Sequence, residues 1–244
     1  MKYSIELNAE ACQLLAEKNL YFTQGNAKLP PARNKLIFDE SAEFGHFAKI
    51  LAGNQFMNIG SYSYTWSPLP TDTKIGNYCS IAAQVVKRGL EHPYQRFTTS
   101  AITYEKGYPP DSQMKQCGIP KKHSAITIED DVWIGAYAML KPGIMLHTGC
   151  IVAARANVTK DVPPYAIVGG NPARVLKMRF PDEIIKLLLE SRWYDYDITK
   201  LAFPSDIEIE AFVELVNQHK ENLPRLSSSN LMDVLTELNI PVQK

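Results

Sequence analysis

The chain has 244 residues, of which 45% are apolar, so it can bury one large core or two small ones. Its 26 basic residues balance 26 acidic residues, and the formal net charge is +0. This balance leaves no broad positive field, so we expect neither nucleic acid nor an anionic membrane as a partner. No stretch suggests an integral membrane segment or a secretion signal, and the four cysteines form no CxxC pair. We therefore expect a cytoplasmic protein without a disulfide framework.

The first 35 residues are predicted to form a helix and a connector. Asn8 is a suitable N-cap residue, and apolar residues spaced for one helix face follow it from about Ala9 to Asn19. Residues 28–33, KLPPAR, are an irregular connector stiffened by proline. From Leu36 to about Phe56 the apolar residues keep no single register.

A repeat of six residues organises the middle of the chain. Met57 to Tyr64 and Ile75 to Val86 contain the first hexapeptides, and after a break an aliphatic residue recurs at every sixth position. The leading positions are Ile128, Ile134, Leu140, Leu146, Val152 and Val158, and the smaller apolar residues that follow each by four are Val132, Ala138, Ile144, Cys150, Ala156 and Val162. Six such leading residues in one register occur by chance roughly once in several thousand starts. A parallel β-helix has this period, because stacked coils bury a shared core.

The six-residue register is lost between Ile81 and Ile128, since the spacing between them is not a multiple of six. We therefore predict a loop insertion over about residues 87–124. Loops of this length inside a compact domain are usually functional, because a rigid scaffold can place chemistry on them.

The chain after the repeat is predicted to be helical. Pro181 opens a helix that runs to about Arg192, and Ser205 with Glu208 forms a capping box for a second helix. A third helix is expected from Asn230 to Asn239, and all three are expected to pack beside the coil.

The predicted fold class is therefore mainly β: a parallel β-helix with an inserted loop and C-terminal α-helices. We divide the chain into an N-terminal helix and connector (1–35), a β-helix domain that carries the insertion (36–178) and a C-terminal helical extension (179–244).

The motifs IGNYCSIA, EHP, ITIEDDVWIG and TKDVPPYAIVGGNPARVLKMRF together resemble the hexapeptide-repeat acyltransferases. Within these, the sequence is similar to the xenobiotic acetyltransferase group, which contains the type B chloramphenicol and streptogramin acetyltransferases and related sugar O-acetyltransferases. The resemblance runs from about Met57 through Tyr196. It implies a left-handed parallel β-helix, a homotrimer with active sites between adjacent subunits, and acetyl-CoA as the acetyl donor.

The resemblance also implies where acetyl-CoA would bind. Family members approach it at the corner glycine of the WIG strand and at the small residue one coil on, which are Gly135 and Ala153 here. The residues expected near its phosphates and adenine are Thr159, Lys160 and Arg174. Lys141 is a weaker candidate for the same role. The alternatives are ordinary solvated surface for the polar residues and a required tight corner for Gly135.

The family's base is a histidine on the loop that leaves the coil after the IGxxCSI strand, and His92 occupies that place. An imidazole with a pKa of about 6.5 can take the proton of an attacking hydroxyl near neutral pH. The alternative is a surface loop histidine. His147 is expected on the surface and His123 is a distant second candidate, whereas neither His46 nor His219 lies in a catalytic context.

The residues expected on the acceptor side are Tyr62, Tyr64, Trp133 and Thr98. The two tyrosines match the strand-plus-SY pattern whose tyrosines line the family's acceptor pocket, and their alternative role is aromatic packing outside the first coil. Trp133 is expected to point outward beside the acetyl group. Thr98 and Thr99 are expected to order the loop. Glu91 is a candidate to orient His92, although the resemblance implies that a backbone carbonyl usually does so. No histidines and acids converge at ligand spacing, so we expect no metal.

Three functions stay open. The first is acetyl transfer to a hydroxyl or amine of a sugar or polysaccharide, favoured by the EHP loop and by C-terminal helices that the small antibiotic-modifying members lack. The second is O-acetylation of an antibiotic of the chloramphenicol or streptogramin type. The third is a non-catalytic structural trimer, against which the complete donor motif and His92 both weigh.

Overall fold

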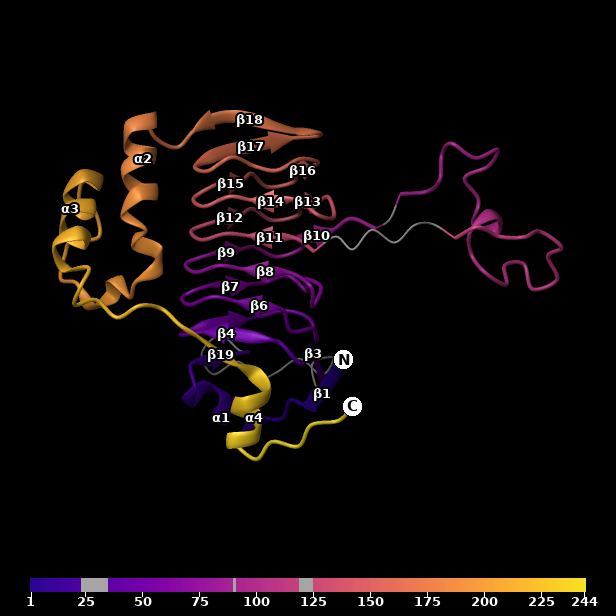
Figure 1. Ribbon diagram of the computed structural model, residues 1–244, viewed down its shortest axis with the longest axis horizontal. Helices are drawn as coiled ribbons and strands as arrows, with labels where there is room; N and C mark the ends of the chain where they lie inside the picture. Colours follow the sequence, from indigo (N-terminus) through magenta and orange to yellow (C-terminus); the bar gives the residue numbers. More distant parts are fainter. Residues whose placement is uncertain (23–34, 90, 119–124) are drawn as a thin grey trace.

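The computed structural model describes residues 1–22, 35–89, 91–118 and 125–244. The predicted connector 28–33 and His123 lie outside these ranges. Within them, short parallel strands stack into a three-sided coil, and helices pack on its side and across one end (Figure 1). The four α-helices found in the described ranges make the fold a mixed α/β structure, where a mainly β one was expected. No helix in the described ranges is both long and apolar enough to cross a membrane.

Each face of the coil is one sheet. The first contains β4 (Glu43–Gly45), β6 (Asn58–Ile59), β8 (Lys74–Ile75), β11 (Thr127–Ile128) and β14 (Met145–Leu146). The second contains β2 (Leu20–Tyr21), β5 (Ala48–Ile50), β7 (Tyr64–Thr65), β9 (Ser80–Ile81), β12 (Trp133–Ile134), β15 (Ile151–Val152) and β17 (Ala166–Gly170), and β18 (Ala173–Met178) closes it as an antiparallel edge. The third contains β10 (Val86–Lys87), β13 (Met139–Leu140) and β16 (Asn157–Val158).

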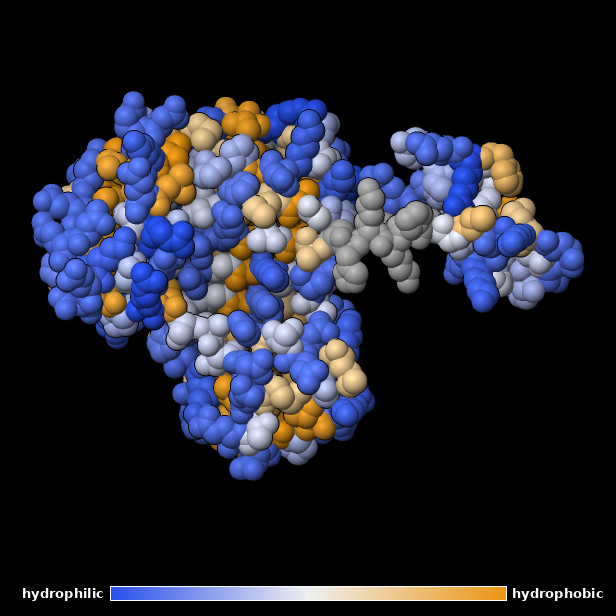
Figure 2. Space-filling view, viewed as in Figure 1, coloured by the Kyte–Doolittle hydropathy of each residue, from blue (hydrophilic) through white to orange (hydrophobic). Residues whose placement is uncertain are grey.

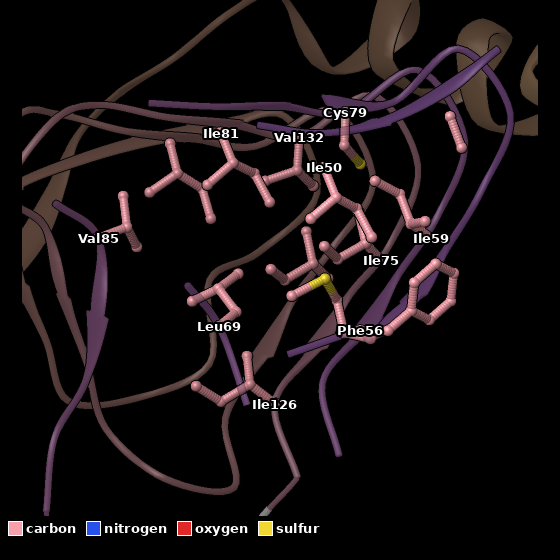
Figure 3. Packing of buried hydrophobic residues seen from close by; sticks show 14 of the residues in the cluster. Ile50, Phe56, Ile59, Leu69, Ile75, Cys79, Ile81, Val85, Ile126 and Val132 are labelled. Carbon is pink, nitrogen blue, oxygen red and sulfur yellow. The ribbon is translucent and has the colours of Figure 1, made fainter. Parts of the chain in front are cut away.

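The six-residue repeat sets the register of this coil. Ile128 pairs with Leu146, Ile134 with Val152 and Leu140 with Val158, so each turn consists of three hexapeptides. All six leading residues are at most 1% exposed, and the six following residues are at most 5% exposed, which confirms the predicted core. Figure 3 shows how Ile75 of β8, Ile81 of β9 and Val132, the residue before β12, point into the same interior. Stacked apolar layers of this kind are the main source of the coil's stability.

Both ends of the chain close the N-terminal end of the coil. β1 (Lys2–Glu6), which the sequence did not indicate, pairs antiparallel with β3 (Lys35–Asp39). The predicted first helix is confirmed as α1 (Ala9–Glu17), whose N-cap Asn8 accepts a hydrogen bond from the Ala11 amide at 2.7 Å. From the other terminus, β19 (Ser228–Asn230) pairs antiparallel with β4, and α4 (Leu231–Glu237) buries three apolar residues in the same core.

The predicted helical extension therefore separates into two parts. α2 (Asp182–Ser191) and α3 (Ile209–His219) pack together beside the coil, as expected, around a cluster that includes Tyr165, Trp193 and Val216 (Figure 1). α4 instead lies at the N-terminal end of the coil. The predicted capping box is wrong, because α3 begins after Glu208 and no side chain caps it.

Between β10 and β11, the described residues 91–118 form an arm. In Figure 1 the arm extends away from the coil on the side opposite α2 and α3. Within it a short 3-10 helix, η2 (Ala101–Thr103), is capped by the Ser100 hydroxyl. Two further 3-10 helices, η3 (Trp193–Asp195) and η4 (Ile198–Lys200), follow α2.

Candidate active site

His92 lies on the arm with its imidazole oriented by the backbone. Its Nδ1 is 2.8 Å from the carbonyl oxygen of Thr99 and 3.2 Å from the hydroxyl of Tyr104. The Tyr104 ring packs edge-on against the imidazole, with centroids 5.8 Å apart. Because a carbonyl oxygen can only accept, the neutral tautomer that fits this contact carries its hydrogen on Nδ1 and a lone pair on Nε2. The exposed Nε2 is therefore available to take a proton.

Short polar contacts hold the rest of the arm together. Arg96 donates to the carbonyl oxygens of Thr103 and Gly118, at 2.8 Å and 3.1 Å. Thr98 accepts from the amide of Ser100 at 3.2 Å, so it contributes to the loop's order as expected. These contacts fix the segment that presents the Thr99 carbonyl to His92.

His92 is oriented by a backbone carbonyl, as the resemblance implied, and not by the candidate Glu91. Glu91 forms an ion pair with Arg88 at 3.3 Å, and the Thr99 carbonyl occupies the position beside Nδ1. A main-chain carbonyl orients the ring without adding a charge next to it.

The polar residues expected at the cofactor's phosphates do converge. Thr159, Lys160 and Arg174 line one cavity of about 210 Å³, formed where the chain leaves β16 and where β18 returns along β17. Asp161 also lines it, but its Oδ1 accepts from the Met145 amide at 2.8 Å. Lys141 does not line this cavity.

Gly135 and Ala153 occupy equivalent positions one turn apart, directly after the paired strands β12 and β15. A Cβ on Gly135 would lie 2.5 Å from the backbone nitrogen of Ala154, so this corner requires glycine. A Cβ on Gly169, another turn along, would lie 3.2 Å from the Cβ of Ala153. The three positions form a column of small side chains on the second face. The tight-corner explanation of Gly135 is thus correct, and its contact with a cofactor stays a prediction.

Trp133 points outward from β12 and is 54% exposed, in the predicted orientation. Its role beside an acetyl group stays a prediction.

Tyr62 and Tyr64 line a cavity of about 260 Å³ together with Phe47, Lys49 and Ser63. The Tyr62 ring is also packed, as its alternative role predicted. It stacks between Phe47 and Tyr78, with centroid distances of 5.8 Å and 5.2 Å. Its hydroxyl donates to Asp197 at 2.8 Å, and burial, followed by this carboxylate, raises the pKa of Tyr62.

A single chain does not bring His92 and Tyr62 together. The hydrogen bonds of His92 stay within the arm, whereas Tyr62 is bonded to the segment after α2, on the opposite side of the coil (Figure 1). Figure 2 shows hydrophobic residues on the face of the coil between these two sides and at the far end of the arm. The arm's exposed apolar residues include Tyr94 (73%) and Phe97 (82%).

Sequence reasoning missed Phe47 and Asp197. Phe47, Tyr62 and Tyr78 all adopt positive φ, between 54° and 60°, at the same corner of successive turns. An aromatic residue recurring at one corner was the available signal, but Phe47 lies in the stretch whose register was weak. For Asp197 no local pattern existed, because its partner Tyr62 is remote in sequence. Among the residues in the described ranges, no three His, Cys, Asp or Glu side chains could hold a metal ion.

A coil of stacked hexapeptides is the fold expected of the hexapeptide transferases, and comparisons with known proteins test that class. A family model described as bacterial transferase hexapeptide (six repeats) matches residues 125–160. A chloramphenicol acetyltransferase of Klebsiella aerogenes is 32% identical over 212 residues, which cover 83% of this chain and 91% of the relative. A probable macrolide acetyltransferase of Lysinibacillus sphaericus is 36% identical over 50% of this chain and 68% of its own length.

One similar solved structure is a maltose O-acetyltransferase from Clostridium difficile 630, with 25% identity, a TM-score of 0.35, and coverage of 50% of this chain and 58% of that one. The long match to the Klebsiella relative shows the family of this chain. The chain belongs to the hexapeptide-repeat acetyltransferases, in the xenobiotic group with the type B chloramphenicol acetyltransferases. It is an acetyltransferase.

Proposed function

We propose that this protein transfers an acetyl group from acetyl-CoA to a hydroxyl of a small xenobiotic acceptor, with His92 as the general base. The observation that carries the proposal is the 2.8 Å contact between His92 Nδ1 and the Thr99 carbonyl. It fixes the tautomer and leaves Nε2 free for the acceptor's proton.

The residues that would hold acetyl-CoA are Gly135 and Ala153 along the pantetheine arm and Thr159, Lys160 and Arg174 near the phosphates. One observation supports this fit: two cationic side chains line one cavity, where they can pair with phosphate groups. When bound, acetyl-CoA supplies an activated acetyl thioester.

His92 then performs the proton chemistry. Its Nε2 accepts the proton of the acceptor hydroxyl as the oxygen attacks, and the resulting imidazolium keeps its Nδ1 hydrogen bond to the Thr99 carbonyl. The imidazolium can afterwards return the proton to the departing sulfur, which restores the neutral base. Nothing in this cycle needs the Glu91 carboxylate.

The names of the relatives support an antibiotic-type acceptor, which the sequence placed second, over a sugar or polysaccharide, which it placed first. One reason for the sugar acceptor was that the small antibiotic-modifying members lack the C-terminal helices. The match to the Klebsiella chloramphenicol acetyltransferase covers 83% of this chain, which is more than the stretch from Met57 to Tyr196. We therefore propose chloramphenicol as the lead acceptor.

We also propose a left-handed coil and a homotrimer whose active sites lie between subunits. The placement of His92 and Tyr62 on opposite sides of one coil supports a site completed by a neighbour. The exposed Tyr94 and Phe97 on the arm are suited to contact another copy, because apolar side chains gain from leaving water.

The test is release of CoA thiol from acetyl-CoA with chloramphenicol, a streptogramin, a macrolide, nucleotide sugars and oligosaccharides. We expect turnover with an antibiotic. Turnover with the saccharides alone would restore the sugar acceptor. If acetyl-CoA binds but no acceptor on the panel reacts, the small xenobiotic acceptor is wrong and a larger polymer becomes the better candidate.

A further inference from the structure

We infer that Asp197, in the C-terminal segment, is a positioning residue for acceptor binding, because it holds Tyr62 in the wall of the cavity beside Tyr64. This inference rests on the proposed function, since it assumes that the acceptor occupies that cavity. Asp197 does not line the cavity itself, so its effect would be exerted through Tyr62.

The contact is short and shielded from water. Asp197 is 7% exposed, and its Oδ1 accepts from the Tyr62 hydroxyl at 2.8 Å, from the Thr199 hydroxyl at 2.5 Å and from the Thr199 amide at 3.1 Å. Lys200 lies 3.9 Å from Oδ2. A buried carboxylate that accepts several hydrogen bonds is a strong fixed acceptor, and hydrogen bonds to a charged group are worth more than neutral ones.

The backbone around Asp197 is anchored to the same corner of the coil. The Tyr78 hydroxyl donates to the carbonyl of Tyr196 at 2.6 Å and accepts from the amide of Ile198 at 3.3 Å. The Asn77 amide group donates to the carbonyl of Tyr194 at 3.1 Å. These bonds fix the backbone on both sides of Asp197, so its carboxylate is a stationary partner for Tyr62.

The hydrogen bond to Asp197 restrains Tyr62. It sits at a corner with a φ of 58°, a conformation that L side chains seldom adopt. The stack between Phe47 and Tyr78 fixes the plane of its ring, and the bond to Asp197 fixes the position of its hydroxyl end. Since Tyr62 and Phe47 both form the cavity wall, releasing the hydroxyl would let that wall move.

The experiment compares Asp197→Ala, Asp197→Asn and Asp195→Ala in the full-length protein. Asp195 is the matched control, because it belongs to the same segment but pairs with Arg192 at 2.7 Å. We expect Asp197→Ala to raise the KM for the acceptor about tenfold and to leave the KM for acetyl-CoA within about twofold. Asp197→Asn keeps an oxygen that can accept from Tyr62, so we expect it to recover most of the loss.

A double-mutant cycle separates positioning from general destabilisation. If Asp197 acts through the Tyr62 hydroxyl, Tyr62→Phe raises the acceptor KM similarly, and adding Asp197→Ala to it costs little more. Equal rises in both KM values, or fully additive effects, would overturn the inference.

A crystal structure of Asp197→Ala gives a readout that does not depend on turnover. We expect the Tyr62 ring to leave its position between Phe47 and Tyr78. A ring that stays in place refutes the inference even if the wild-type enzyme proves active, whereas an inactive wild type refutes only the proposed function.

Discussion

The Nδ1 atom of His92 lies 2.8 Å from the carbonyl oxygen of Thr99, seven residues along the same arm. This single contact determines which imidazole nitrogen holds the hydrogen and which is basic. It also explains why the arm needs internal order, since Thr99 can orient His92 only if the intervening chain keeps its shape. The bonds from Arg96 and to Thr98 supply that order.

Tyr104 is expected to contribute packing more than hydrogen bonding. Its hydroxyl is 3.2 Å from His92 Nδ1, but the single hydrogen there already points to the closer carbonyl. We predict that Tyr104→Phe keeps kcat within about threefold, and that Tyr104→Ala, which removes the edge-on ring, lowers kcat about tenfold. Steady-state kinetics of the two variants measures the difference. Equal losses in both would show that the hydroxyl is the important group.

Lys160 and Arg174 are expected to bind the phosphates of acetyl-CoA. We predict that Lys160→Ala and Arg174→Ala each raise the KM for acetyl-CoA about two- to fivefold, because an exposed ion pair contributes roughly 0.2–1 kcal/mol. The effect should shrink as salt is added, since these side chains are exposed.

The matched control for these two variants is Lys141→Ala, which removes an exposed lysine outside the cavity. If Lys141→Ala raises the KM for acetyl-CoA as much as the other two variants do, the effect comes from the protein's net charge and not from a phosphate contact.

Gly135 is expected to be required for the coil itself. An alanine Cβ would lie 2.5 Å from the Ala154 backbone nitrogen, and backbone in a stacked coil cannot easily move away. We predict that Gly135→Ala lowers the free energy of unfolding by about 1–3 kcal/mol, the usual cost of overpacking. Urea denaturation measures this loss of unfolding free energy. The control is Gly118→Ala, because a Cβ on Gly118 would meet nothing within 4 Å. Equal stability of the two variants would contradict the geometry.

The pairing of Asp197 predicts a dependence of stability on pH. Burial raises the pKa of Asp197, but hydrogen bonds from Thr199 and Tyr62 more than offset this and hold the pKa below its ordinary value. A lowered carboxyl pKa gives stability that is present above the unfolded value of about 3.9 and is lost as the pH falls through the lower folded value.

The wild type should therefore be more stable than Asp197→Asn at pH 7, with a difference that shrinks below about pH 4. Urea denaturation at pH 7, 5 and 3 measures the difference. A constant gap down to pH 3 would mean that Asp197 has no lowered pKa.

The coil could be predicted from the sequence because its period is set by local chemistry. Each hexapeptide must place one aliphatic side chain inward, as Ile134 and Val152 do, so the repeat is visible without knowing any partner. The ends of the coil could not be predicted in the same way. The pairing of β19 with β4, and the bridge between Ser4 and Gln243, join segments from opposite termini that carry no repeat.

In the candidate site, too, the residues in short motifs could be predicted, whereas contacts between remote segments could not. The place of His92 and the convergence of Lys160 with Arg174 followed from motifs confined to short stretches. The resemblance implied a backbone carbonyl beside His92, with Glu91 as the other candidate, but the sequence alone does not reveal which carbonyl the arm folds back to present. Asp197 was missed because its contact with Tyr62 joins the coil to the segment after α2.

The proposed role of His92 is tested by the kcat of His92→Ala for acetyl transfer to chloramphenicol, measured by thiol release at saturating acetyl-CoA. Removing a general base should lower kcat by about a hundredfold or more, while the KM for acetyl-CoA stays within about twofold. A variant that keeps more than a tenth of the wild-type kcat would show that another group takes the acceptor's proton.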